Sequence, residues 1–340
     1  MATVDADRAR GAWIDPRDAA LTFREVAERW LAANPAKRES TWTADESTLR
    51  NHVLPELGAH RIGSITRANL QRLVSTWSET LRPRSVKRVF GTTRAVFNFA
   101  VESDFIAKSP CRGVKLPALD AVRVRHLSAD DVAVLAETMP PAHRLMVWIG
   151  AMTGLRWGEV AALRVGRVDV LGRTLTVVDQ VARGRGGVSR IGPPKSRAGV
   201  RTLTMPAVLC ELVAEHLAAR GLTGADADEL LFVSDKGGPL DYPNWRRRVW
   251  LPACAAAGLD GAGFHDLRRA NATALVAGGV DVKTAQARLG HSDPRLTLAV
   301  YAQATTEADR AAADVIGERF AGCSRDGAGA GGQERRPRGR

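Results

Sequence analysis

The chain has 340 residues, enough for two domains, and 45% of them are hydrophobic. Its formal net charge of +12 favours a polyanionic partner. Nucleic acid is favoured over an anionic membrane because the sequence has no long apolar run and no helical pattern with a lysine-rich face. The four cysteines lie far apart and the start of the chain lacks a signal peptide, so we expect no metal site, no membrane partner and a cytoplasmic location.

The first third of the chain predicts a small helical domain. Residues 1–20 form a short extension, and residues 21–109 contain four helical patterns. The first pattern opens with a capping box at Thr22, the second covers about residues 43–53, and the third starts at Thr66. Four short helices in this order are typical of a compact helical domain.

The fourth helical pattern separates an apolar stripe from a positive face. Its apolar residues recur at helical spacing, and the opposite side gathers the basic residues Arg84, Lys87, Arg88 and Arg94. Such a face is often only solvated. Here every charge on it is positive until Glu102, and the whole chain is basic, so contact with the DNA backbone is an equal alternative.

The sequence changes character after residue 109. Residues 110–127 contain prolines and several charges and predict a linker, and residues 128–320 predict a second domain that begins with a helix capped by Ser128. An apolar helix is expected over residues 142–152. Residues 321–340 are rich in Gly and Arg and predict a disordered tail.

The middle of the second domain predicts a small antiparallel sheet. β-branched residues alternate over residues 174–178, and two more strands are expected over residues 188–191 and 200–204. Residues 193–199, which include Lys195, are expected to form a hairpin loop between these two strands. The fold class is therefore mostly α with a small antiparallel sheet, an α+β arrangement.

Residues suited to phosphate chemistry gather near the end of the second domain. His265 and Arg268 are three residues apart, so they share a face of a helix. A helix expected over residues 281–290 would place His291 just beyond its end. The next helix, starting near Pro294, would carry Tyr301 about two turns further on.

These residues, together with Thr153-Gly154-Leu155-Arg156 and Lys195, resemble the conserved motifs of tyrosine recombinases, the phage integrase family. The motifs stand in the family's order, and the resemblance covers roughly residues 20–320. It implies an N-terminal helical core-binding domain followed by a catalytic domain. Tyr242, the other tyrosine of the chain, lacks a histidine or arginine pattern before it.

The resemblance assigns a role to each residue of the constellation. Tyr301 would attack a DNA phosphorus, and Arg156 and Arg268 would neutralise the non-bridging oxygens. Lys195 would protonate the departing 5′ oxygen. His265 and His291 would donate hydrogen bonds or move the tyrosine proton, and Glu159 would orient its neighbours.

The implied function is site-specific DNA recombination, as in a phage or mobile-element integrase, through a 3′-phosphotyrosyl intermediate and without a metal or nucleotide cofactor. The implied partners are double-stranded DNA with a recombination site, three further copies in a homotetramer on two duplexes, and an accessory directionality or DNA-bending protein. Two alternatives stay open: a type IB topoisomerase-like enzyme, and a DNA-binding regulator of the same fold without catalysis. In the family, a last helix such as residues 306–320 docks on a neighbouring protomer; docking on its own domain is the alternative.

Overall fold

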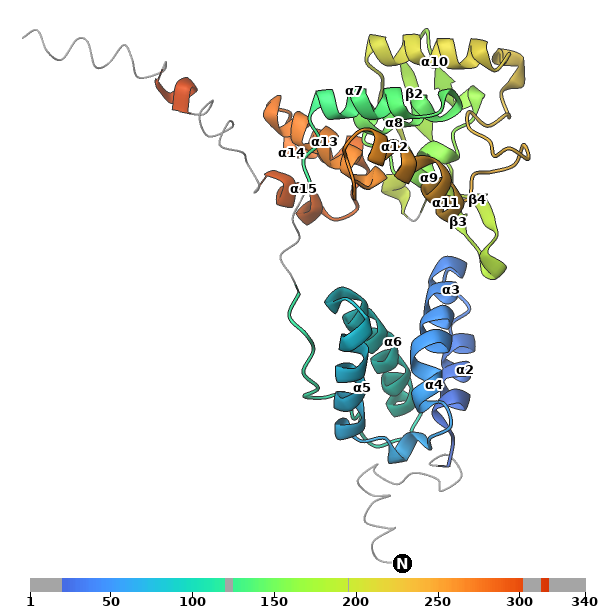
Figure 1. The fold of residues 1–340 in the computed structure, drawn as a ribbon, viewed down its shortest axis with the longest axis vertical. Helices are drawn as coiled ribbons and strands as arrows, with labels where there is room; N and C mark the ends of the chain where they lie inside the picture. Colours follow the sequence, from blue (N-terminus) through green and yellow to red (C-terminus); the bar gives the residue numbers. More distant parts are fainter. Residues whose placement is uncertain (1–19, 120–124, 195, 302–312, 318–340) are drawn as a thin grey trace, which may run out of the picture. The chain divides into compact units, whose positions relative to one another are not determined.

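The structure of the chain is a computed structural model that describes residues 20–119, 125–194, 196–301 and 313–317 (Figure 1). Its contacts define two compact units. One unit runs to Val124 and includes Arg183–Val188, and the other comprises Arg125–Ala182 and the chain from Ser189 onward. The division at residue 124 falls inside the segment predicted as a linker. No helix in the described ranges combines the length and apolar character needed to cross a membrane.

The first unit is built from helices around one apolar core. The capping box predicted at Thr22 is formed, and the helix predicted to start at Thr66 also begins with one. The ring centroids of Phe23 and Phe97 lie 5.3 Å apart between the first and last helices. The helices are α2 (Phe23–Ala33), α3 (Glu39–Thr48), α4 (Leu54–Leu57), α5 (Arg67–Thr80) and α6 (Pro83–Glu102).

The second helix is longer than the sequence predicts. It begins at Glu39 rather than near residue 43, and a π-helical turn, Leu49–Val53, joins α3 to α4. Pro55 lies just beyond the predicted end of this helix at residue 53, but it does not end the helix. It lies in the first turn of α4, directly after the π-helical turn, and the helical backbone continues past it.

The second unit is also mainly helical, and a glycine lets two of its central helices approach closely. A Cβ atom at Gly150 would lie 2.9 Å from Phe264 Cζ and 3.0 Å from Leu267 Cδ1. The helices are α7 (Ala129–Thr138), α8 (Pro141–Thr153), α9 (Trp157–Ala161), α10 (Ala207–Ala219), α11 (Tyr242–Trp245), α12 (Leu251–Ala256), α13 (Phe264–Ala277), α14 (Val282–Leu289) and α15 (Pro294–Tyr301).

The strands form two separate sheets, which corrects the predicted hairpin loop. One antiparallel sheet has the order β1 (Val168–Asp169), β2 (Thr174–Val177) and β5 (Arg201–Thr204), and the other pairs β3 (Gln180–Arg183) with β4 (Ser189–Gly192). The prediction that residues 193–199 close a hairpin is therefore wrong, because this segment passes from one sheet to the other. The strand β3 was not predicted from the sequence, and it pairs with β4. β2 instead pairs with β5, where buried Leu175 lies opposite buried Leu203.

Candidate active site

The first arginine of the constellation is fixed at the start of α9. Gly154 ends α8 in the left-handed conformation at φ 69°, and Arg156 is the N-cap of α9. The carboxylate of Glu159 accepts hydrogen bonds from the backbone N–H of Arg156 at 2.9 Å and from its guanidinium at 2.8 Å. The side chain of Arg156 is 40% exposed, whereas that of Glu159 is 1% exposed. The buried carboxylate therefore fixes Arg156, and part of the guanidinium stays accessible to solvent.

The second arginine, Arg268, is held from both ends of its guanidinium. It lies in the first turns of α13 and is 3% exposed. One terminal nitrogen donates to the carbonyl of Gly154 and the other to the carbonyl of Leu289, both at 2.6 Å. Burial, and then the charge of Arg156, lower the pKa of Arg268 to about 9, so the guanidinium remains positive near neutral pH.

The end of α14 gathers the arginines. Its last carbonyls accept from three of them: Arg288 O from Arg201 at 2.8 Å, Leu289 O from Arg268 at 2.6 Å, and Gly290 O from Arg156 at 3.5 Å. A helix C-terminus carries partial negative charge, so it is a favourable place for cations. Gly290 ends this helix in the left-handed conformation, as its position in the sequence predicted.

The two histidines lie beside these arginines. Burial, followed by the charges of Arg268, Arg269 and Arg156, lowers the pKa of His265. Burial, then Arg268 and Arg156, lowers the pKa of His291 to about 4. One ring nitrogen of His291, Nδ1, shares a hydrogen bond of 2.9 Å with Thr297 Oγ1. Both rings are therefore neutral near pH 7 and can donate or accept a single proton.

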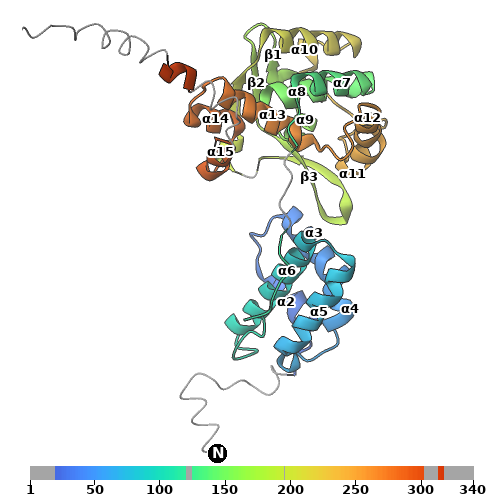
Figure 2. The same ribbon diagram turned by 60° about the vertical axis from the view of Figure 1, so that its left-hand side comes forward.

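The elements that carry these groups pack together. α13, α14 and α15 lie side by side in both views (Figures 1 and 2), so His265, Arg268 and the turn of His291 belong to one corner of the unit. Tyr301 is the last residue of α15, and its backbone is helical as predicted. Lys195 lies outside the described residues. The structure thus brings together Arg156, His265, Arg268 and His291, and the roles of Tyr301 and Lys195 stay predictions.

Arg201 is a residue of this cluster that was not predicted from the sequence. Its side chain is 7% exposed and forms an ion pair of 3.0 Å with Glu159, which is also the partner of Arg156. Burial would raise the pKa of Glu159, but the hydrogen bond and charge of Arg201, with those of Arg156, lower it on balance. An arginine in a short strand is usually exposed, so the residue type gave no signal of this role.

The basic face predicted on the fourth helix of the first unit is present on α6. Arg84, Arg88 and Arg94 are exposed and Lys87 is half-buried, whereas Val86, Val89 and Phe90 face the core. The apolar stripe predicted from the helical spacing is therefore buried. Among the described residues, no group of three His, Cys, Asp or Glu side chains could hold a metal ion.

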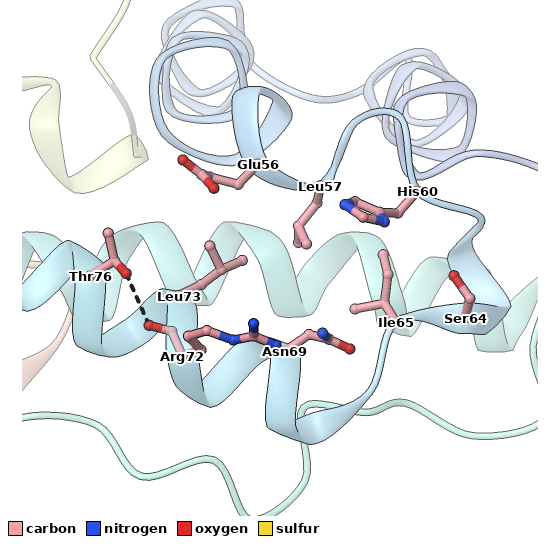
Figure 3. Close-up of a pocket in the computed structure, with 9 residues that line it drawn as sticks. All are labelled: Glu56, Leu57, His60, Ser64, Ile65, Asn69, Arg72, Leu73 and Thr76. Carbon is pink, nitrogen blue, oxygen red and sulfur yellow. Dashed lines mark hydrogen bonds between the residues drawn. The ribbon is translucent and has the colours of Figure 1, made fainter.

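A pocket of 310 Å³ lies elsewhere in the first unit, between α4 and α5 (Figure 3). Its lining combines apolar and polar side chains. It is lined by Glu56, Leu57, His60, Ser64, Ile65, Asn69, Arg72, Leu73 and Thr76. None of these residues belongs to the predicted constellation.

Comparison with known proteins places the chain in a family. The profile of the Phage integrase family matches residues 125–308, and that of the phage integrase N-terminal SAM-like domain matches residues 22–78. The integrase of Mycobacterium phage L5 is 27% identical over 317 residues, which cover 89% of this chain and 83% of that protein.

Solved structures share the fold. The Tn1549 transposon integrase in complex with transposon right end DNA has a TM-score of 0.73 and 21% identity, covering 88% of this chain and 100% of that chain. A lambda integrase tetramer bound to a Holliday junction has a TM-score of 0.63 and 20% identity, covering 86% of this chain and 80% of that chain. The chain therefore belongs to the phage integrase family of tyrosine-type site-specific recombinases.

Proposed function

We propose that this chain recombines DNA at a specific site by forming a 3′-phosphotyrosyl bond through Tyr301, as an integrase of a phage or another mobile element. The observation that carries the proposal is the cluster of Arg156, His265, Arg268 and His291, from three elements of one unit. Such a cluster suits a phosphate whose charge grows as a fifth oxygen joins phosphorus.

Each group has a distinct part in the proposed cleavage. Arg156 and Arg268 hold the non-bridging oxygens, since guanidinium groups present paired donors and stay charged. A neutral His265 or His291 can accept the phenolic proton of Tyr301 as its oxygen attacks phosphorus. Lys195 gives a proton to the departing 5′ oxygen, and Glu159 orients Arg156.

The proposed chemistry exchanges one phosphodiester for another. The bond from phosphorus to the 5′ oxygen breaks as the bond to the tyrosine oxygen forms, so the link to the enzyme keeps the free energy of the DNA bond. A 5′ hydroxyl of a second strand then attacks and releases the tyrosine. The exchange consumes no nucleotide and needs no metal ion.

The proposed partner is a specific double-stranded DNA, bound partly through the α6 residues Arg84, Lys87, Arg88 and Arg94. The Tn1549 integrase structure is a complex with transposon right end DNA, and the lambda integrase structure is a tetramer bound to a Holliday junction. We infer a homotetramer on two duplexes for this chain, acting in the cytoplasm of a bacterial host. An accessory directionality or DNA-bending protein would complete the assembly.

The decisive experiment uses Tyr301→Phe, which removes the nucleophilic oxygen and keeps the shape of the ring. The substrate is a nicked suicide DNA built from the sequences that flank this reading frame. Wild-type protein should form an adduct that resists denaturation and maps to Tyr301 by mass spectrometry. The variant should form none and bind the DNA with nearly unchanged affinity, because phosphate contacts dominate binding.

Two results would contradict this assignment: an adduct at Tyr242, or the absence of any adduct with the cognate site. Relaxation of supercoiled DNA that lacks a recombination site would instead favour the topoisomerase-like alternative. Specific binding without cleavage by the wild-type protein would favour a regulator.

A further inference from the structure

Arg201 joins three segments of the second unit through one guanidinium group. Its terminal nitrogens donate to both oxygens of Glu159, at 3.0 and 3.3 Å, and one of them also donates to Gly199 O at 2.9 Å. Its Nε donates to Arg288 O at 2.8 Å. The side chain is 7% exposed, so these bonds form in a largely dry environment where each matters more than in water.

The first of these partners, Glu159, also binds Arg156. Glu159 is a buried carboxylate that holds the guanidinium of Arg156 at 2.8 Å and its backbone N–H at 2.9 Å. Without Arg201, this carboxylate would lose half of its charged partners. It could then rotate toward water or take up a proton, and Arg156 would lose its fixed orientation.

Arg201 also binds the end of α14, next to the turn that carries His291. Arg201 binds the carbonyl of Arg288, the penultimate residue of α14, and Gly290 packs against it so tightly that a Cβ there would lie 2.9 Å from an Arg201 terminal nitrogen. The same Cβ would lie 2.8 Å from Ala198 O. The guanidinium therefore fills the space between the strand β5 and the end of α14.

We propose that Arg201 is a positioning residue for strand cleavage, which fixes Arg156 through Glu159 and fixes the His291 turn through the end of α14. The inference rests on the proposed function. Arginine suits this task because its planar group sends donors in several fixed directions. Lysine offers one nitrogen and cannot span a carboxylate and two carbonyls.

The test is a double-mutant cycle in the full-length protein with Arg201→Gln and Arg156→Lys, on the same nicked DNA. Arg201→Gln should slow single-turnover cleavage roughly 100-fold, as expected when a reacting geometry shifts by about an ångström. Its DNA affinity should change less than about threefold, since phosphate contacts elsewhere dominate binding. If Arg201 acts partly through Arg156, the double variant should lose several-fold less cleavage rate than the product of the two single losses.

Arg220→Gln is the matched control. Arg220 is half-buried and, like Arg201, donates to backbone carbonyls, among them that of Leu231 at 2.7 Å. It follows the last residue of α10 as its C-cap and takes no part in the cluster. It should lower stability and leave the cleavage rate of the folded protein unchanged. Urea unfolding identifies any variant that does not fold, and Arg201→Lys then replaces Arg201→Gln in the cycle.

Losses that multiply in the cycle would overturn the proposal, because they would mean that the two arginines act independently. A wild-type cleavage rate in Arg201→Gln, or an equal loss in Arg220→Gln, would overturn it as well. A wild-type protein that forms no covalent adduct would overturn the proposed function together with this inference. If the wild-type protein forms its adduct normally and the two losses multiply in the cycle, only this inference is overturned.

Discussion

His291 shows at the scale of a single residue how the arginine cluster sets the chemistry of its neighbours. Burial and the adjacent charges of Arg268 and Arg156 lower its pKa to about 4, and His265 is shifted in the same direction. A phosphate placed among these groups would bring negative charge and oppose the shift. The rings of His265 and His291, which are neutral in the free protein, can therefore take up a proton more readily when DNA is bound.

This shift predicts how the stability of the free protein depends on pH. Between about pH 6.5 and 4 the unfolded chain binds a proton at His291 that the folded chain does not, so stability should fall as pH falls through this window. His291→Gln should reduce the difference in unfolding free energy between pH 7 and pH 4.5, measured by urea denaturation. The exposed His126, replaced in the same way, is the control. An unchanged difference in His291→Gln would show that this ring is not held neutral.

At the scale of elements, the cluster depends on how closely α8 and α13 approach. Gly150 gives α13 room, and Arg268 on α13 reaches back to the carbonyl of Gly154 at the end of α8. The same helix pair therefore sets both the packing of the core and the position of one proposed phosphate ligand. The two helices can pack this closely because Gly150 has no side chain.

Gly150→Ala should separate the two helices. The new methyl group would lie 2.9 Å from Phe264 Cζ, and overpacking of this kind costs about 1–3 kcal/mol. Chemical denaturation of the full-length chain should register this loss. Gly91→Ala on α6 is the control, and it should raise the free energy of unfolding. A Cβ there meets nothing within 4 Å, and alanine is the better helix former by roughly 0.5–1 kcal/mol. Equal effects at the two positions would refute the close-contact argument.

At the scale of the whole molecule, the helix predicted over residues 306–320 is expected to take part in assembly. Residues 313–317 are helical, and Val315 and Ile316 in that segment are 65% and 58% exposed. The rest of the helix predicted over residues 306–320 lies outside the described residues. An apolar face on a terminal helix needs a partner, and a neighbouring protomer would supply one.

Truncation after Gln303 should therefore separate DNA binding from assembly. The shortened chain keeps every residue of the proposed active site, so it should bind a single recombination site with normal affinity. It should fail to join two duplexes, which native gels and sedimentation can measure with two differently sized DNA fragments. Normal two-duplex complexes from the truncated chain would assign the segment to another role.

The sequence by itself determined the features whose causes are local. Capping boxes at Thr22, Thr66 and Ser128 depend on residues three positions apart, and all three are formed. The stop at Gly290 likewise follows from the conformational freedom of one residue. The order of six residues along the chain indicated the family, and the profile match confirmed it; they are Arg156, Lys195, His265, Arg268, His291 and Tyr301.

Tertiary structure decided what depends on partners distant in the chain. The pairing of β4 with β3, and of β5 with β2, rests on which strands meet, and the sequence pattern of a four-residue strand does not encode that choice. The sequence does not reveal the role of Arg201, because only its burial beside Glu159 and the end of α14 distinguishes it from a surface arginine. A guanidinium becomes a structural group when folding removes its water and leaves the protein to supply every acceptor.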